Sequence, residues 1–360
     1  MGRGAVRRQG WQGLALGRGC GYAWPIFTQR KCRNCLLALL TVSGFLFGIA
    51  PTMSSAATVE VELDARRSII EVAPGVKMRA WTFNGTVPGP VVRATEGDTV
   101  EVTLTNSDIG KRIKCPKKLT RQQKQKLGIV RTKQREAARR KCIRKKSRNQ
   151  PTAHSVDFHA AKIAPNLAFR SVLPGDTHIF SFKVDTPGVY MYHCGTGPML
   201  EHTGMGMYGM IIVDPVEGRT PAEEIMLVQS EFYGSVKDGW LQSSYEAMQT
   251  EAPKYVTFNG SAFKYASDPI QVEAEEPLRI YLVDAGPSQF SSFHVVGTIF
   301  DQFQPDGNPD APIRNVSTQV IGPGGGGLFE CVLPEPGSYP FVSHSFRDFD
   351  KGAVGILQAE

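Results

Sequence analysis

The sequence has no apolar run long enough to cross a membrane comfortably, and its charged fraction is modest. Its most apolar stretch, residues 36–50, is about 15 residues long, whereas a spanning helix needs about 20. Only 21% of residues are charged, and the chain contains 37 glycines and 24 prolines. This composition excludes collagen-like, coiled-coil and disordered chains. Because turn-forming residues are so frequent, it favours many short strands, and we predict an all-β protein.

Acidic residues are also scarce in two segments. Residues 1–35 hold seven Lys/Arg and no acid, and residues 111–148 hold eighteen Lys/Arg and one acid, Glu136. From the totals of 41 bases and 34 acids, the rest of the chain keeps 16 bases and 33 acids, a net charge of −17. The overall charge of +7 therefore describes an acidic body with two basic attachments.

The first attachment resembles an export signal. A basic segment runs into the apolar residues 36–50, and the small residues of Met53–Ala57 follow at the spacing that signal peptidase requires. We expect residues 1–57 to be an export signal and the mature chain to be periplasmic or otherwise extracytoplasmic. An uncleaved membrane anchor is the alternative.

The second attachment is an insert in a repeated domain. Thr82-Phe83-Asn84-Gly85 recurs as Thr257-Phe258-Asn259-Gly260, and Pro187-Gly188 recurs as Pro336-Gly337, with spacings of 105 and 79 residues. The sequence therefore predicts two copies of one β-sandwich, at 58–215 and 216–360, with the extra residues at 107–150. The Lys/Arg-rich part of the insert has no apolar stripe, which predicts a solvated helix or disorder.

The insert also contains a cysteine pair and lacks aromatic residues. Cys115 and Cys142 could close a disulfide around the insert outside the cytoplasm. Since no aromatic residue is available to stack on bases, nucleic-acid binding is not expected. Elsewhere, Cys331 is expected to be a buried strand residue.

The histidines fall in short segments beside Cys, Met or Asp. The segment 192–209 places Cys194, His202 and several methionines on one loop after a strand. With one histidine from an upstream strand, this is the His₂Cys plus weak axial Met set of a blue copper centre. We assign His154 as that histidine, because neighbours on a strand point to opposite sides and His193 must then face away. Met207 is the axial candidate, with Met199, Met205 and Met210 as alternatives.

Three motifs together resemble the two-domain copper-containing nitrite reductases. They are Ala153–Ala161, the His193-Cys194 loop, and Pro340–Phe346 with Gly352–Gly355. The resemblance covers about 80 to 358 apart from the insert. It implies two tandem cupredoxin-type Greek-key β-sandwiches.

The resemblance also implies roles for individual residues. The type 1 copper ligands would be His154, Cys194, His202 and Met207. The type 2 copper ligands would be His159, His193 and His344, the last reaching a neighbouring subunit of a homotrimer. Asp157 and His294 would be the catalytic acid groups. Val296 would stand over the copper where many members carry isoleucine, which could widen the substrate pocket.

The implied activity is reduction of nitrite to nitric oxide. Electrons from a small redox protein, a cytochrome c or a cupredoxin, would enter at the type 1 copper and pass through Cys194-His193 to the type 2 copper. Asp157 and His294 would deliver the two protons that the reaction needs. One type 1 and one type 2 copper per chain are expected.

Two other functions stay open from the sequence. A laccase-like multicopper oxidase needs about eight histidines with His-x-His pairs, whereas this chain has seven histidines and no such pair. An exported electron carrier would use the blue copper set alone. The basic insert could receive an acidic electron donor or be a solvated excursion without a partner.

Overall fold

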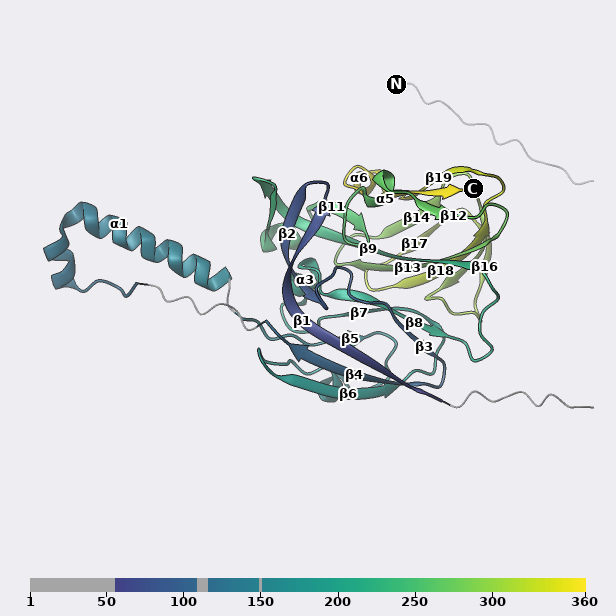
Figure 1. The fold of residues 1–360 in the computed structure, drawn as a ribbon, viewed down its shortest axis with the longest axis horizontal. Coiled ribbons are helices and arrows are strands. Elements are labelled where there is room, and N and C mark those ends of the chain that lie inside the picture. Colours follow the sequence, from purple (N-terminus) through teal and green to yellow (C-terminus); the bar gives the residue numbers. More distant parts are fainter. Residues whose placement is uncertain (1–55, 109–115, 149–150) are drawn as a thin grey trace, which may run out of the picture. The chain divides into compact units, whose positions relative to one another are not determined.

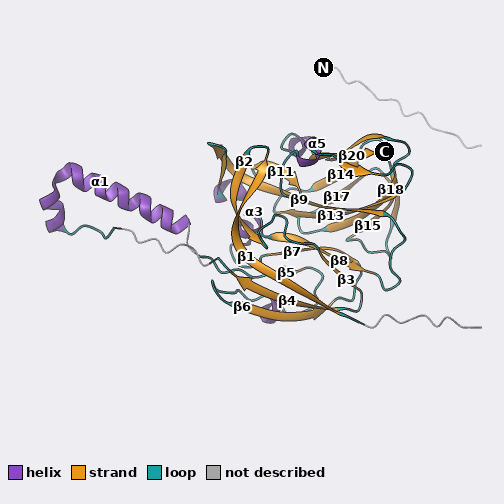
Figure 2. Ribbon diagram, viewed as in Figure 1, coloured by secondary structure: helices purple, strands orange, loops and turns teal. Residues whose placement is uncertain are grey.

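The computed structural model describes residues 56–108, 116–148 and 151–360, and strands dominate it (Figure 1, Figure 2). Residues 1–55, which hold nearly all of the expected export signal, lie outside the described residues. In the described ranges no helix has the length and apolarity needed to cross a membrane.

One large sheet runs through both halves of the chain. It contains β1 (Thr58–Ala73), β2 (Val76–Phe83), β4 (Thr99–Asn106), β6 (Thr177–Lys183), β9 (Glu223–Lys237), β10 (Trp240–Ser243), β11 (Pro253–Phe258), β13 (Pro277–Gly286), β15 (Phe300–Pro305), β16 (Ile313–Val316) and β18 (Gly326–Val332). Strand β2 of the first half pairs with β10 of the second at Lys77 and Trp240. The sheet is mixed, since β1 and β4 as well as β9 and β13 pair in parallel.

Two smaller sheets complete the sandwiches. The first consists of β3 (Val92–Thr95), β8 (Tyr208–Asp214), β7 (Gly188–His193) and β5 (Asp157–Phe158). The second consists of β12 (Ile270–Val272), β20 (Val354–Ala359), β19 (Gly337–Ser343), β14 (Ser291–Val295) and β17 (Thr318–Ile321). Each half has its own hydrophobic core between its two layers, which confirms the predicted pair of β-sandwiches.

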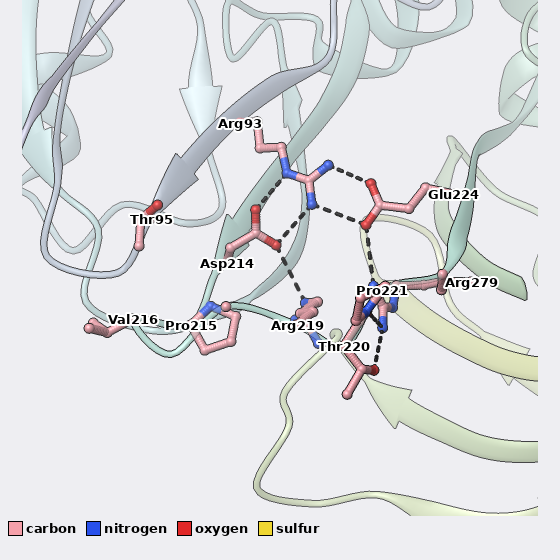
Figure 3. Close-up of a pocket in the computed structure, with 12 residues that line it drawn as sticks. Arg93, Thr95, Asp214, Pro215, Val216, Arg219, Thr220, Pro221, Glu224 and Arg279 are labelled. Carbon is pink, nitrogen blue, oxygen red and sulfur yellow. Dashed lines mark hydrogen bonds and ion pairs between the residues drawn. The ribbon is translucent and has the colours of Figure 1, made fainter. Parts of the chain in front are cut away.

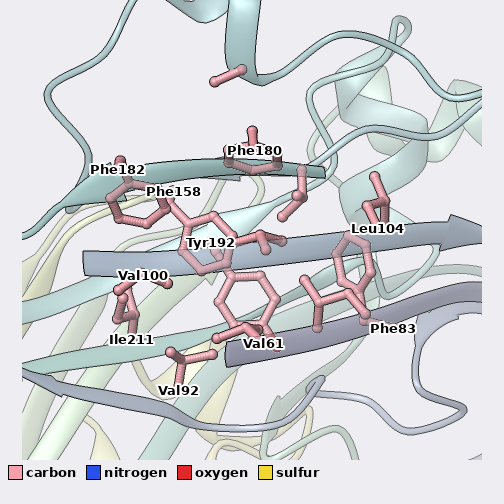
Figure 4. Packing of buried hydrophobic residues seen from close by; sticks show 14 of the residues in the cluster. Val61, Phe83, Val92, Val100, Leu104, Phe158, Phe180, Phe182, Tyr192 and Ile211 are labelled. Atoms are coloured by element: carbon pink, nitrogen blue, oxygen red, sulfur yellow. The ribbon is translucent and has the colours of Figure 1, made fainter. Parts of the chain in front are cut away.

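The core of the first sandwich is built on aromatic rings (Figure 4). Phe158 of β5 stacks on Tyr192 of β7 with ring centroids 5.0 Å apart, and Phe182 of β6 packs on Phe158 at 5.3 Å. All three rings are buried. Buried aromatic pairs stabilise a core beyond the area they bury, so β5, although only two residues long, is held firmly against β7.

The internal repeat is a structural duplication. Asn84 and Asn259 both adopt positive φ, 56° and 51°, ahead of a glycine that does the same. The side-chain oxygen of each asparagine accepts a backbone N–H of the first strand of its domain, from Asp64 at 2.6 Å and from Val228 at 2.8 Å. The two Thr-Phe-Asn-Gly motifs therefore make the same turn, and each asparagine bonds to an equivalent position on the first strand of its domain.

The insert contains the long helix α1 (Arg121–Arg148), which is one of the two alternatives, helix or disorder, that the sequence left open. Its apolar residues Ile129 and Val130 are 76% and 68% exposed, so the helix has no buried apolar face among the side chains that the structure describes. Cys142 is disulfide-bonded, and Cys115 lies outside the described residues. The other helices are short, namely α2 (Pro165–Ala168), α3 (Met199–Gly204), α4 (Tyr245–Gln249), α5 (Lys264–Ser267) and α6 (Phe346–Phe349).

A charged network clamps the two sandwiches together (Figure 3). Arg93 of β3 contacts Asp214 at the end of β8, at 2.5 Å, and Glu224 of β9, at 2.5 Å. Arg279 of β13 contacts Glu224 at 3.3 Å and Glu330 at 2.7 Å. The hydrogen bond from Arg93 lowers the pKa of Glu224 to about 2 despite partial burial. Glu224 thus connects a strand of the first domain to the core sheet of the second.

We expect Arg279→Leu to destabilise the protein, because it leaves Glu224 and Glu330 without a buried cation. The Arg279 side chain is 3% exposed and its partners are 22% and 28% exposed. The free energy of unfolding should fall by about 2 kcal/mol, less than for a fully buried pair. Urea unfolding measures the change. Lys162→Ala, which breaks the exposed pair with Asp185, is the control and should leave the unfolding midpoint in place; equal midpoints for both variants would contradict the clamp.

Candidate metal centres

The pairing of β5 with β7 positions one group of polar residues. Phe158 pairs with Tyr192 and Asp157 with His193 in this ladder, and the backbone N–H of His159 donates to the carbonyl of Met191 at 3.0 Å. Since strand side chains alternate between faces, Phe158 and Tyr192 point into the core while their neighbours point outward. Asp157, His159 and His193 consequently converge, with ligand atoms all within 4.8 Å of one another.

The residue after His193 belongs to a second, buried group. Cys194 Sγ lies 3.1 Å from Nδ1 of His202 and 3.9 Å from Nδ1 of His154, and these two nitrogens are 3.3 Å apart. All three residues are buried. Three donor atoms therefore meet at one buried point, a geometry that suits a metal ion with soft and imidazole ligands.

The surroundings of Cys194 favour its thiolate. Burial alone would raise the thiol pKa, but contacts with His154 and His202 and the backbone N–H of Ser155, 3.4 Å from Sγ, together lower the pKa to about 5. The thiolate is the form that binds metals. The indole of Trp81 closes this site, with its ring centroid 4.8 Å from that of His202.

A buried carboxylate stands behind His154. Nε2 of His154 lies 3.8 Å from Oδ2 of Asp108, and both side chains are at most 3% exposed. Asp108 also contacts Arg67 Nε at 3.0 Å. Burial opposes ionisation of Asp108, but His154 and Arg67 outweigh it and lower the pKa of the carboxyl. Asp108 therefore fixes the imidazole ring from the side opposite the cluster.

The fold places the four methionines considered as axial ligands in different surroundings. Met207 is fully buried in the same core cluster as Cys194, and its backbone links the two cluster segments. Its carbonyl accepts the Cys194 N–H at 3.0 Å, and its N–H donates to the His202 carbonyl at 3.2 Å. Met205 and Met210 pack in other clusters, and Met199 is 56% exposed.

In the Asp157–His159–His193 cluster, both imidazoles have one nitrogen anchored. Nδ1 of His159 lies 3.0 Å from the Gly324 carbonyl, and Nδ1 of His193 lies 3.0 Å from the Cys194 carbonyl. Because a carbonyl only accepts, Nδ1 carries the proton in each ring. The two Nε2 atoms are 3.1 Å apart, and their lone pairs then face each other. Desolvation, and next the repulsion from His193, lower the pKa of His159, which keeps that ring neutral and able to bind a metal.

The remaining predicted residues lie on the second sandwich. His294 and His344 are neighbours there, with ring centroids 5.6 Å apart. Nδ1 of His294 donates to the Ser317 carbonyl at 2.6 Å, so its Nε2 is also free. Val296, two residues further on, is 44% exposed. Among the described residues, neither histidine belongs to a metal-ligand cluster of its own chain.

Three contributions to these sites escape the sequence reasoning. Asp108 and Trp81 are far from the motifs in sequence. Residues 322–325 connect β17 to β18, and the carbonyl of Gly324 among them anchors His159. Because every residue has a backbone carbonyl, the residue type does not show which carbonyl will accept a hydrogen bond from a histidine. Only the fold identifies it.

Comparisons with known proteins agree with this arrangement. Two multicopper oxidase family profiles match, one over residues 64–111 and one over 145–217. The copper-containing nitrite reductase of Neisseria gonorrhoeae is 35% identical over 311 residues, 84% of this chain and 69% of the relative.

Solved structures give the same result. The copper nitrite reductase from Nitrosomonas europaea superimposes with a TM-score of 0.68 at 35% identity, covering 84% of this chain and 94% of the other. The copper-containing nitrite reductase from Thermus scotoductus SA-01 gives a TM-score of 0.67 at 33% identity, covering 85% and 62%.

We expect Gly324→Ala to disturb the Asp157–His159–His193 cluster. Gly324 has φ +85°, and a Cβ there would lie 3.2 Å from Cε1 of His159. Gly175→Ala is a matched control, since Gly175 has φ +93° and nothing within 4 Å of its Cβ position. Both variants should lose about 1 kcal/mol of stability from backbone strain. Only Gly324→Ala should lose metal affinity at this cluster, by about 10-fold; equal affinities by competition with a chelator would show that Gly324 does not position His159.

Proposed function

Because this chain belongs to the copper-containing nitrite reductase family, we propose that it reduces nitrite to nitric oxide with two copper ions per chain. One observation carries the proposal. His193 of the exposed cluster and Cys194 of the buried cluster are consecutive residues. A single peptide bond therefore joins a site suited to electron exchange to a site open to a substrate.

The ligand chemistry fits copper at both places. His154, Cys194, His202 and Met207 would hold a type 1 ion in the buried cluster, and His159 and His193 would supply part of a type 2 site. Copper in the first set exchanges single electrons, and copper held by imidazoles alone keeps a coordination position open for nitrite or water. The protein contributes rigidity at the second site, because a backbone carbonyl holds Nδ1 of both His159 and His193. At the buried cluster, His154 faces Asp108 and His202 packs on Trp81.

The second site is incomplete within one chain, and we propose that His344 of a neighbouring subunit completes it. Its own chain places His344 on the second sandwich, apart from His159 and His193. Apolar side chains are exposed on the same β14–β17 and α6 region, namely Phe290, Val296, Val320 and Phe346. An exposed apolar surface around a histidine suits a subunit interface.

This contact joins different surfaces of the two subunits. A contact of that kind must close into a ring if it is not to form filaments. We propose a homotrimer, the ring that the family resemblance implies.

Proton delivery is assigned to Asp157 and His294. Reduction of nitrite consumes one electron and two protons and yields nitric oxide and water. Asp157 belongs to the same cluster as His159 and His193, where its carboxyl group can donate to a nitrite oxygen. His294, held at Nδ1 by the Ser317 carbonyl, would be the second donor through Nε2 once subunits meet, from the imidazolium form that carries a proton on both nitrogens. Val296 beside it would shape the substrate pocket.

The proposed function also implies a cellular location and an electron donor. The mature chain would act in the periplasm or elsewhere outside the cytoplasm, after export directed by residues 1–57, or anchored to the membrane if that signal is not cleaved. A small redox protein, a cytochrome c or a cupredoxin, would supply the electron. An electron carrier without catalysis would need the buried cluster but has no use for the His159–His193 pair.

The first test separates the two coppers. Cys194→Ala should abolish the blue charge-transfer absorption and reduce donor-driven turnover to background, while type 2 copper stays bound. Cys331→Ala is the control, since Cys331 is also buried but belongs to the core of the second sandwich. Electron paramagnetic resonance, together with a count of copper ions per chain, measures the occupancy of the type 1 and type 2 sites. Blue colour that survives Cys194→Ala would refute the assignment.

The second test concerns proton delivery. Asp157→Asn and His294→Ala should each lower turnover by about 10²–10⁴-fold, the range for general acid–base groups, with both coppers retained. Asp185→Asn, an exposed carboxylate paired with Lys162, is the control and should be as active as the wild type. Normal turnover of either site variant, measured as nitric oxide released, would mean that the protons arrive by another route.

A further inference from the structure

The basic insert has a charge that its own residues do not neutralise. Helix α1 contains thirteen Lys/Arg and one acid, Glu136, and Glu136 is paired with Lys124 at 2.6 Å. The body of the chain has the opposite sign, with 16 bases and 33 acids outside the two basic segments. The insert is therefore a strongly positive element on a negative protein.

The insert also has its own internal structure. The hydroxyl of Thr132 donates to the Lys124 carbonyl at 3.4 Å, and Lys124 pairs with Glu136 across twelve residues. In a straight helix, residues eight positions apart, such as Lys124 and Thr132, are separated by about 12 Å along the axis, which is too far for this hydrogen bond. The helix must consequently bend back on itself in this region, and side chains of Lys118 and Arg139 line a shallow hollow there.

Both ends of the insert are fixed beside the type 1 ligand His154. Asn106 Nδ2 donates to the Thr152 carbonyl at 2.9 Å, and the Thr152 N–H donates to Asp108 Oδ2 at 3.2 Å. Asn106 and Asp108 are buried. The insert therefore begins and ends at the same place on the first sandwich, and Thr152 at its end is two residues before His154. Arg148, four residues before Thr152, cannot lie more than about 14 Å from it.

We infer that the insert, over its described residues 116–148, is the docking surface for an acidic redox protein that delivers the electron. This inference rests on the proposed function. The acidic body repels such a partner, and the insert alone attracts it, so the field orients the encounter toward the fixed ends of the insert at His154. Nucleic acid is the other polyanion to consider, but α1 has no aromatic residue for stacking.

The test compares two sets of four charge-neutralised residues. The insert variant carries Lys126→Gln, Arg131→Gln, Lys133→Gln and Lys141→Gln, all exposed positions of α1. The matched control carries Lys183→Gln, Lys237→Gln, Lys254→Gln and Lys264→Gln, exposed positions of the two sandwiches. Both variants lower the net charge by four, so only the location differs.

The measurement is stopped-flow bleaching of the blue absorption by a reduced acidic cupredoxin, over a series of salt concentrations. The insert variant should react at least about 10-fold more slowly at low salt, with a weaker salt dependence, while the control changes less than about twofold. Hydroquinone, a small uncharged reductant, should bleach all three proteins equally. Wild-type protein that hydroquinone cannot bleach would contradict the proposed function itself.

Two results would overturn the docking surface while leaving the proposed function intact. One is an unchanged rate with the acidic donor in the insert variant. The other is an equal loss in the control variant, which would show that total charge matters and location does not. If the insert variant instead loses affinity for a fluorescent oligonucleotide at an unchanged donor rate, the insert is a nucleic-acid surface.

Discussion

The stacking of Phe158 on Tyr192 is the interaction on which both candidate metal centres depend. It holds the two-residue strand β5 against β7, and strand alternation then places Asp157, His159 and His193 together on the outer face. Cys194 follows directly, beyond the end of β7, and turns into the buried cluster. A shift of one residue in this ladder would exchange the faces of the whole set, so one aromatic pair determines which side chains can bind metal.

Within the described part of the chain the buried cluster occurs once, and the duplicated scaffold explains why. In the second sandwich the Ser343 N–H donates to the Ala353 carbonyl at 3.1 Å, and the Ala353 N–H donates to the Asp348 carbonyl at 3.1 Å. Cys194, Met207 and His202 make the same two bonds at 3.0 and 3.2 Å. Ser343, Ala353 and Asp348 therefore occupy the ligand positions without a thiolate, thioether or imidazole. The two domains share this backbone frame, and at these three positions only the first has metal-binding side chains.

Much of this arrangement can be predicted from the sequence. The Thr-Phe-Asn-Gly repeat predicts the two sandwiches because asparagine and glycine tolerate the positive φ of that turn. The loop with Cys194 and His202, taken with the upstream His154, predicts three residues that the fold does bring together. The Asp108–His154 contact, the Gly324 carbonyl and the Arg93–Glu224–Arg279 clamp could not be predicted. Each depends on residues brought together from distant segments. The bend of α1 could not be predicted either, since it is marked only by the contacts of Lys124 with Thr132 and Glu136.

The central claim, a catalytic centre shared between subunits, is tested most directly by mixing two inactive variants. In the proposed shared centre, His159→Ala would damage the first-domain half and His344→Ala the second-domain half. If the proposed trimer forms, coexpression in equal amounts should give mixed trimers with one intact site each and restore about one quarter of the wild-type nitrite reduction and type 2 copper signal. Recovery near that level supports the shared centre. Two inactive variants that stay inactive when coexpressed, although light scattering shows mixed trimers, would contradict it.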